Sequence, residues 1–519
     1  MPWRTVPTVG EIDLDRGRIG KVVIAGGGTA GWIAACALSH QLRGIVDISL
    51  VESEQIGTIG VGESTIPPIR AFHRLMQIDE KEVMRATAAT FKLSISFEGW
   101  LRKNDRYFHG FGNTGKGTWA CDFHHFWLDS LRRGFKSEIS DFCLETVASR
   151  NERFATLERS EINYAYHMDA GKYARYLRGI SEDRGVRRIE GKIREVRQHS
   201  ESGFVEALVL ESGQVVEGDL FIDCTGFRGM LIEQTLHAGY EDWNQWLPCD
   251  RAVAMQTESV GPPVPYTRAI AHEAGWRWRI PLQHRVGNGM VYASDHLSDD
   301  EVCARLLRDI EGQPINDPAI IRFRTGRRRQ AWSRNVVALG LSSGFVEPLE
   351  STSIHVIITG VVRLIQMFPV NGISRSFTDK YNEDTRIELE RIRDFIILHY
   401  CVTERDEPMW RQCREMRLPE SLAHRIQLFR ERAHAWQDPN ELFRVDSWMQ
   451  VMLGQGIVPE HHHPLAQALS DQDMRTLFDS IRQPIERAVA QMPAQQAFID
   501  GYCKAGPEVW ASKPSAMEG

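Results

Sequence analysis

The chain has 519 residues, 42% of them hydrophobic and 25% charged, which is typical of a globular protein and allows one large core or two modules that share a core. The formal net charge of −7 argues against general binding to nucleic acid or anionic lipid. No stretch is long and apolar enough to span a bilayer, and residues 1–20 do not have the apolar run of a signal peptide.

The cysteines and histidines do not indicate a metal site. The nine cysteines are odd in number and have no CxxC spacing, which favours free thiols in a reducing cytoplasm over disulfides or zinc. Histidines 461–463 are adjacent and cannot all face one ion, and His124 and His125 are expected at the surface or in packing. The basic run at residues 327–329 is expected to be a solvated turn before a strand.

The first elements predict a dinucleotide-binding unit. Residues 21–25 read as a buried strand, residues 29–40 as a helix and residues 46–51 as a second strand that ends at Glu52. The connecting turn has the pattern Gly26-x-Gly28-x-x-Gly31, whose glycines let the backbone approach a pyrophosphate at a helix N-terminus. Glu52 is placed to accept hydrogen bonds from a ribose hydroxyl.

Later segments complete an α/β fold. Residues 57–68 form a loop rich in glycine and proline, and further elements are expected as a helix at 69–89, a strand at 91–100, a helix at 173–184, strands within 188–216, 220–224, 276–294 and 335–340, a helix at 352–367, and helices beyond 379. The chain has no second GxGxxG pattern. Segments 219–229 and 336–341 resemble the later flavin contacts of one large FAD module, so FAD fits better than NAD.

We therefore expect an FAD-binding dinucleotide fold, similar to that of glutathione reductase and the aromatic hydroxylases, with an added, largely helical substrate module. The FAD-binding module, with inserted substrate-side strands, is expected to span about residues 15–380. A helical substrate-side region is expected at residues 381–519, packed on the first module as one unit.

Six ordered segments narrow the family. They are GGGTAGW at 26–32, GVGESTIP at 60–67, FKLSISF at 91–97, HGFG at 109–112, WRWRIP at 276–281 and GFVEPLESTSI at 344–354. With these segments the chain resembles the flavin-dependent tryptophan halogenases through about Trp410. The resemblance implies an FADH2-dependent halogenase of the indole type, in which FADH2, oxygen and halide give hypohalous acid that halogenates an electron-rich aromatic ring.

The resemblance also implies roles for the reacting groups. Lys92 would deliver the halogen, because an amine can hydrogen-bond hypohalous acid or form a haloamine, and desolvation would lower its pKa. Glu350 would orient the halogenating species, stabilise the cationic ring or remove its proton. A wall between flavin and substrate would keep the flavin from hydroxylating the ring; it consists of Trp276, Trp278, Ile280 and Pro281.

The remaining matched positions concern cofactor, halide and substrate. Thr352 and Ser353 would bind halide through their backbone amides at a helix start, although the tryptophan-specific members commonly have glycine where this chain has Ser353. His109 and Phe111 would sandwich the indole. The cofactor-binding set is Gly26, Gly27, Gly28, Thr29, Ala30, Gly31, Glu52, Val61, Ser64, Leu341 and Ile354, with residues 60–65 as a strap over the flavin.

Beyond Trp410 the groups that hold a free amino acid are not recognisable. Indole, an indole derivative and tryptophan all stay open as substrates, as do chloride and bromide. A separate NADH-dependent flavin reductase would supply FADH2, and a homodimer is the expected assembly. Two other classes share the fold: a single-component FAD monooxygenase of aromatics, and a non-catalytic FAD-binding protein. Neither needs Lys92, Glu350 or the tryptophan wall.

Overall fold

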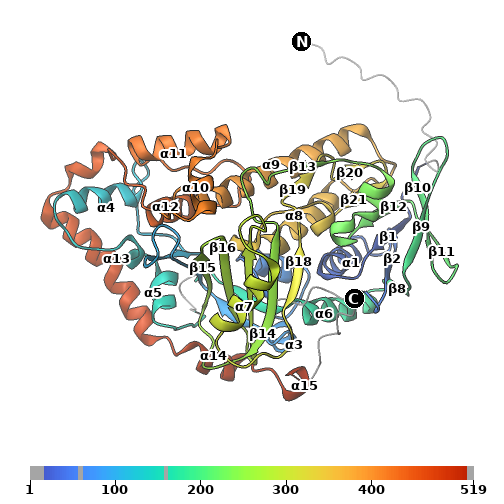
Figure 1. The fold of residues 1–519 in the computed structure, drawn as a ribbon, viewed down its shortest axis with the longest axis horizontal. Coiled ribbons are helices and arrows are strands. Elements are labelled where there is room, and N and C mark those ends of the chain that lie inside the picture. The colour runs from blue at the N-terminus through green and yellow to red at the C-terminus, as the bar shows by residue number, and fades with distance from the viewer. Residues whose placement is uncertain (1–16, 57–61, 157–161, 511–519) are drawn as a thin grey trace, which may run out of the picture.

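The computed structural model describes residues 17–56, 62–156 and 162–510, in which two larger sheets are surrounded by helices (Figure 1). The first sheet has the strand order β20-β21-β12-β1-β2-β8, and all neighbouring pairs are parallel except β20 with β21. Its strands are β1 (Lys21–Ala25), β2 (Asp47–Glu52), β8 (Arg187–Glu190), β12 (Leu220–Asp223), β20 (Trp332–Ser333) and β21 (Val336–Ala338). Separate segments of the chain thus build one parallel sheet, as expected for an α/β dinucleotide fold.

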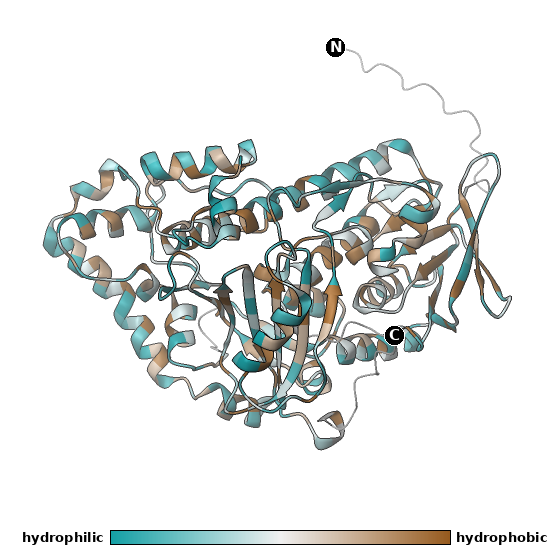
Figure 2. Ribbon diagram, viewed as in Figure 1, coloured by the Kyte–Doolittle hydropathy of each residue, from teal (hydrophilic) through white to brown (hydrophobic). Residues whose placement is uncertain are grey.

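Helix α1 (Thr29–Gln41) connects β1 to β2 and packs against α6 (Ala170–Asp183) and α8 (Ser353–Gln366). Residues 31–39 of α1 are all buried, which explains why this helix is apolar on every face. Figure 2 shows the same contrast across the molecule: the strands are mostly hydrophobic, whereas outer helices such as α11 (Glu420–Arg432) carry many hydrophilic residues.

The second large sheet has the strand order β18-β14-β17-β16-β15-β5-β6 and is antiparallel except between β15 and β5. Its strands are β5 (Ser94–Glu98), β6 (Arg106–Gly110), β14 (Arg251–Glu258), β15 (Tyr266–His272), β16 (Gly275–Pro281), β17 (Arg285–Tyr292) and β18 (Ala319–Arg322). Beside it lies a small sheet of β3 (Gly62–Ser64), β7 (Ala165–Asp169) and β4 (Thr90–Lys92).

Two further three-stranded sheets complete the strands. They are β11-β10-β9, with bounds Val215–Glu217, Val205–Leu210 and Ile193–Gln198, and β13-β19-β22, with bounds Tyr240–Asp242, Gly326–Arg328 and Gly344–Phe345. The other α-helices before residue 375 are α2 (Pro68–Leu75), α3 (Glu80–Ala86), α4 (Phe123–Arg132), α5 (Leu144–Arg150) and α7 (Asp299–Asp309). The short helical turns are η1 (Ile139–Phe142), η2 (Gly226–Arg228), η3 (Met230–Thr235), η4 (Gly340–Ser342), η5 (Pro348–Glu350) and η6 (Pro464–Ala468).

The C-terminal region is helical, as predicted. Besides α11 it contains α9 (Arg375–Cys401), α10 (Pro408–Glu415), α12 (Val445–Gly454), α13 (Asp471–Gln491), α14 (Gln495–Tyr502) and α15 (Pro507–Trp510). Residue 380, where we place the module boundary, lies within α9, and the division into two modules stays a prediction. Among the described residues, no helix has both the length and the apolar character that crossing a bilayer requires.

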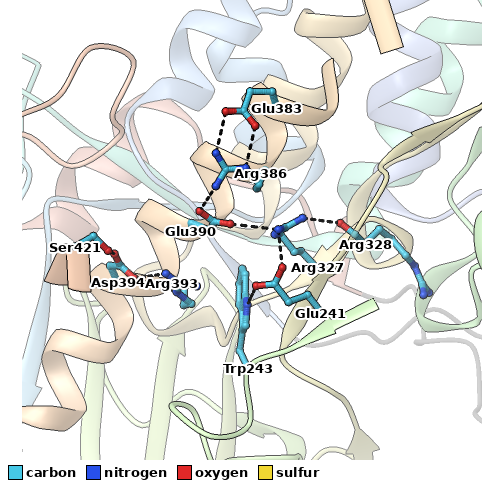
Figure 3. A network of polar contacts seen from close by, with 10 residues as sticks. All are labelled: Glu241, Trp243, Arg327, Arg328, Glu383, Arg386, Glu390, Arg393, Asp394 and Ser421. Carbon is cyan, nitrogen blue, oxygen red and sulfur yellow. Dashed lines mark hydrogen bonds and ion pairs between the residues drawn. The ribbon is translucent and has the colours of Figure 1, made fainter. Parts of the chain in front are cut away.

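The basic run is not a solvated turn, so that prediction is wrong. Arg327 and Arg328 belong to β19 and are each 7% exposed. Arg327 pairs with Glu241 at 2.6 Å and with Glu390 of α9 at 3.2 Å, as Figure 3 shows. The charge pattern alone could not reveal carboxylates that come from distant segments.

Two other elements differ in detail from the prediction. Residues 69–89 form two helices, α2 and α3, because the backbone turns at Gln77 with a φ of 57°. Residues 91–100 form β4 and β5, whose side chains are buried on both faces, apart from the partly buried Glu98. The expected alternation is absent because both faces of these strands are covered by other elements.

Candidate active site

The turn after β1 forms a cradle that fits a dinucleotide phosphate. Gly26 has a φ of 107°, in the left-handed region that favours glycine. A Cβ at Gly31 would overlap the carbonyl oxygen of Gly26, so only glycine lets α1 pack this closely. Gly28 has no neighbouring atom within 4 Å of the place a Cβ would occupy, which leaves its backbone open to a ligand. With Thr29 and Ala30 the first turn of α1 presents unpaired backbone N–H groups there.

Glu52 lies at the expected end of β2 and its carboxylate lies over Gly27. It accepts from Arg188 Nε at 2.5 Å and from Trp32 Nε1 at 3.3 Å. The guanidinium compensates the charge of Glu52 while the carboxylate stays at the rim of the cradle, where a ribose would lie.

The later strands bring their loops to the same edge. Gly226 follows β12 with a φ of 70° and has no atom within 4 Å of the place a Cβ would occupy, whereas a Cβ at Gly340 would lie 2.8 Å from Ala30. Leu341 of η4 and Ile354 of α8 therefore lie on the side of α1 expected for flavin contacts. Val61 lies outside the described residues. The cradle and these converging loops fit FAD.

Lys92 is fully buried at the end of β4. Its Nζ donates to the carbonyl oxygen of Thr65 at 3.1 Å and to Ser351 Oγ at 2.9 Å, and it lies 5.0 Å from the centre of the Phe111 ring. Burial lowers the pKa of Lys92 to about 7, against an opposing attraction to the charge of Glu350. The lowered pKa makes the neutral amine accessible near neutral pH.

Glu350 is also fully buried, at the end of η5, between two histidines. His109 Nδ1 lies 2.9 Å and 3.0 Å from its two carboxylate oxygens, and His399 Nε2 lies 3.0 Å from Oε1. Burial alone would raise the pKa of Glu350, but attraction to His109 and its hydrogen bond, together with His399, outweigh this and hold the pKa at about 2.

The chain topology explains why these groups meet. In the antiparallel pair of β5 and β6, His109 is opposite Ile95, and the Phe111 N–H donates to the carbonyl of Leu93 at 3.0 Å. The HGFG segment is thereby held beside the FK segment. The structure brings together Lys92, Glu350, His109 and Phe111, as the resemblance implied.

The helix start expected to hold halide adjoins this centre. Ser351 has a φ of 59°, which turns the chain sharply between Glu350 and α8. Thr352 is the N-cap residue of α8 and Ser353 its first residue, and the Thr352 side chain caps no backbone N–H. The first-turn amides of a 14-residue helix are suited to an anion.

The expected wall is one strand, β16, with its two tryptophans buried. Trp278 is opposite Gly289 of β17, where any side chain would collide with the indole. Trp276 Nε1 donates to Glu347 Oε2 at 2.9 Å, and Tyr400 donates to the same oxygen at 2.6 Å. Burial raises the pKa of Glu347 to about 7. The wall is therefore fixed to the loop that carries Glu350.

Several residues of this centre were not predicted. His399, Thr65 and Ser351 contact Lys92 or Glu350, and Glu347 binds Trp276 of the wall. His399 lies in the apolar run of α9, where nothing in the spacing separates it from a packing histidine. Thr65 acts through its carbonyl, which any residue could supply.

His124 and His462, from the two histidine clusters, are buried and hydrogen-bonded to protein atoms. His124 Nε2 donates to the Ala433 carbonyl at 2.7 Å, and His462 Nε2 donates to Asp129 at 3.0 Å. No group of three or more potential ligands among the described parts of the chain could hold a metal ion.

The fold and the separation of a phosphate cradle from a buried lysine–glutamate centre define a flavoenzyme class, and three comparisons give its family. A model of the tryptophan halogenase family matches residues 21–471. Tryptophan 6-halogenase SttH of Streptomyces toxytricini is 35% identical over 516 residues, covering 92% of this chain and 97% of that protein.

Two solved structures agree. Xcc4156, a flavin-dependent halogenase from Xanthomonas campestris, superposes with a TM-score of 0.93 at 51% identity and covers 94% of this chain and 99% of its own. BrvH, a flavin-dependent halogenase from Brevundimonas sp. BAL3, has a TM-score of 0.90 at 43% identity, with 93% and 99% covered.

The chain therefore belongs to the tryptophan halogenase family. It is a flavin-dependent halogenase, an enzyme that uses FADH2 and halide, and this family implies an aromatic substrate and a separate flavin reductase. The alternatives of a single-component monooxygenase and of a non-catalytic FAD-binding protein are set aside.

Proposed function

We propose that this enzyme halogenates indole or an indole derivative, with Lys92 as the group that delivers the halogen. The observation that carries the proposal is the position of the Lys92 amine, fully buried and bonded to the Thr65 carbonyl and the Ser351 hydroxyl. When bound in the cradle, reduced FAD with oxygen and halide would supply hypohalous acid. Every later step concerns this chain's own side chains.

The hydrogen bonds of Lys92 support a neutral amine in that step. A neutral amine has two N–H groups, and the structure offers two acceptors, Thr65 O and Ser351 Oγ. The remaining position on nitrogen is then a lone pair that can bond to the halogen while the O–halogen bond breaks and hydroxide leaves; the amine keeps both N–H protons, and the hydroxide becomes water with the proton that the ring later gives up. The halogen passes from the amine to the ring, and the ring gives up its proton.

Glu350 is the group proposed to take that ring proton. Its pKa of about 2 keeps it ionised at neutral pH, so that it can stabilise the cationic ring and accept a proton from it. His109 and His399, whose ring nitrogens lie within 3.0 Å of the carboxylate oxygens, keep Glu350 ionised, and the proton that Glu350 takes from the ring passes on to the hydroxide, which leaves as water. Thr352 and Ser353 would hold halide, and Trp276 to Pro281 would keep the ring from the flavin.

His109 and Phe111 are proposed to hold the flat ring. Phe111 is half-buried, and the ring of His109 is oriented by its bond to Glu350. An aromatic ring between them lies near the Lys92 amine, which is 5.0 Å from the Phe111 ring centre. Stacking on these two rings suits any electron-rich aromatic of indole size.

Polar contacts near this position support indole over free tryptophan. Gln450 is bonded to both the N–H and the carbonyl of Gly110, and Asp446 accepts from the Thr114 N–H at 2.8 Å. Glu441 binds Arg425 at 3.1 Å and the Trp448 indole N–H at 3.1 Å. These groups already have protein partners, so they gain little from binding an ammonium or a carboxylate.

Competition between indole and tryptophan in one reaction tests this substrate assignment. We expect indole to be halogenated at least as efficiently as tryptophan. A site without dedicated partners for the ammonium and carboxylate of tryptophan gains no binding energy from these groups. A strong preference for tryptophan would contradict the assignment and would imply that one of these polar groups exchanges its partner.

We also propose a homodimer in the cytoplasm, supplied with FADH2 by an NADH-dependent reductase. The nine cysteines are all free thiols, and seven of them are buried, which fits a reducing compartment. Light scattering of the purified protein measures the assembly directly.

A further inference from the structure

A chain of buried hydrogen bonds connects Ser64 of the strap with Pro281 of the wall through Thr267, His167 and Thr90, three residues without a role in the reaction proposed above. We name it the His167 chain; its members are Ser64, Thr267, His167, Thr90 and the carbonyl of Pro281. The Ser64 and Thr267 hydroxyls are 2.9 Å apart, and Thr267 lies 2.9 Å from His167 Nε2. His167 Nδ1 lies 3.1 Å from the Thr90 hydroxyl, which donates to the Pro281 carbonyl at 2.7 Å. His167 and Thr90 are completely buried.

The last bond fixes the direction of every other. A carbonyl oxygen only accepts hydrogen bonds, so the Thr90 hydroxyl donates its single proton to the Pro281 carbonyl. Thr90 must therefore accept a hydrogen bond from His167 Nδ1–H. A neutral imidazole then has only a lone pair at Nε2, so Thr267 donates to it. Thr267 has no further proton, so Ser64 donates to Thr267. Each donor in the chain makes one hydrogen bond, and these bond directions hold only while His167 is neutral.

The hydrogen-bond chain connects segments whose relative positions matter for the reaction. Ser64 ends β3, the described part of the strap at residues 60–65, and Pro281 ends the wall strand β16. Thr90 begins β4, whose last residue is Lys92, while Lys92 Nζ bonds to Thr65, the neighbour of Ser64. Strap, wall and catalytic strand thus meet at one imidazole.

We propose that His167 is a positioning residue that holds the flavin strap through Thr267 and Ser64 and, separately, the wall and the strand of Lys92 through Thr90. This inference rests on the proposed function, because it takes the strap and Lys92 in the roles given above. It predicts that the two ends of the chain can be separated by substitution.

The neutral state that the bonds require is also the state that the surroundings favour. Burial and the nearby Lys92 charge hold the pKa of His167 well below its usual range. A protonated His167 would present N–H to Thr267 and force the Thr267–Ser64 bond to reverse. The chain therefore keeps one hydrogen-bond direction near neutral pH.

The test uses one variant for each end of the chain. Thr267→Val cuts the strap side and leaves the Thr90 side intact; Thr90→Val does the reverse. We measure FAD affinity by flavin fluorescence, without turnover, and the halogenated product formed per reduced flavin consumed, at saturating FAD. With Thr267→Val we expect FAD affinity to fall about tenfold and product per flavin to stay within about twofold; with Thr90→Val we expect the opposite pattern.

A purely structural role would give a different result. His73→Asn is the matched control, because His73 is also buried and hydrogen-bonded, to Tyr173 at 2.9 Å, but is not in the chain. If both valine variants lose both properties together, or neither property more than His73→Asn does, the proposal is overturned. Since the affinity measurement needs no halogenation, an inactive wild-type protein would reject the proposed function while the strap-side effect on FAD could still be judged.

A second pair of variants covers the case in which a valine prevents folding. The amide nitrogen of His167→Asn can replace Nδ1 and keep the bond to Thr90, whereas the amide oxygen of His167→Gln can replace Nε2 and keep the bond to Thr267. We expect His167→Asn to weaken FAD binding and His167→Gln to lower product per flavin. The same behaviour from both variants would overturn the proposal.

Discussion

The amine of Lys92 donates to the hydroxyl of Ser351 at 2.9 Å, which ties β4 to the turn that follows Glu350. Ser351 adopts a φ of 59°, a left-handed conformation that costs a non-glycine residue free energy and turns the chain from Glu350 into α8. One hydrogen bond thereby fixes the distance between the proposed halogen-delivering group, the proposed base and the helix start proposed to hold halide.

Removing the amine should separate flavin chemistry from halogenation. In Lys92→Ala we expect FAD binding and NADH-driven peroxide formation to persist, because the phosphate cradle does not involve Lys92. Halogenation should fall about 100-fold or more, since a positioned reacting group contributes at least this much. Product analysis beside a peroxide assay measures both. Lys172→Met, at another largely buried lysine, is the control; halogenation near the wild-type level in Lys92→Ala would show that another group delivers the halogen.

The pH dependence of halogenation should follow the protonation state of Lys92. Burial lowers the pKa of Lys92 to about 7, so its neutral form grows as the pH rises through this value. If the neutral amine takes the halogen, kcat for halogenation rises with pH around neutrality, while FAD affinity changes little. Steady-state rates over this range, with reductase in excess, measure the profile. A kcat that falls as the pH rises through 7 would instead indicate the ammonium form, acting as a hydrogen-bond donor.

His399 should control the ionisation of Glu350. Its Nδ1 donates to the Phe395 carbonyl at 2.8 Å, which directs Nε2 toward Glu350. His399→Leu removes an attraction that lowers the pKa of Glu350, so we expect this pKa to rise from about 2. Because the acid limb of kcat belongs to Lys92, the Glu350 carboxylate is titrated directly, by infrared spectroscopy of the folded protein. We expect His399→Gln, which can still donate to the carboxylate, to restore most of the low pKa, and an unchanged Glu350 titration in the leucine variant would reject this role.

The sequence predicted the parts of the site that lie within one segment. Gly26, Gly28 and Gly31 are spaced by the geometry of a single turn and helix, and Glu52 ends the adjacent strand, so local pattern was sufficient. Lys92 and Glu350 were found through the segments around them, because a lysine on a strand gives no signal of its own burial. Their neighbours come from β6, α9 and the strap, and no spacing in the chain brings these together.

The fold could be predicted from the sequence to a similar extent. The parallel sheet follows from the βαβ unit and the two later apolar strands, and the structure agrees. The partners of Arg327 were missed because Glu241 and Glu390 approach it from 86 and 63 residues away. A run of like charges indicates solvent exposure only when the fold brings no opposite charge into contact with it. Whether it does so depends on tertiary structure.

The buried Arg327 should contribute to stability, whereas the exposed Arg329 should not. Arg327→Met leaves Glu241 and Glu390 facing each other without the guanidinium, so we expect a loss of about 1–3 kcal/mol in the free energy of unfolding, moderated because both carboxylates are partly exposed. Arg329, exposed in the same run, is the matched control, and Arg329→Met should stay within about 0.5 kcal/mol of wild type. Denaturant titration gives both values. Equal effects would mean that the ion pairs of Arg327 contribute nothing.

The central claim is that this chain puts a halogen on an indole ring by way of Lys92. The most direct measurement combines the purified protein with a separate flavin reductase, FAD, NADH, bromide and indole, followed by mass spectrometry of the product, for the wild type and Lys92→Ala in parallel. We expect a product with the bromine isotope pattern from the wild type and only unmodified indole from the variant. A hydroxylated indole, or brominated indole in equal yield from both proteins, would contradict it.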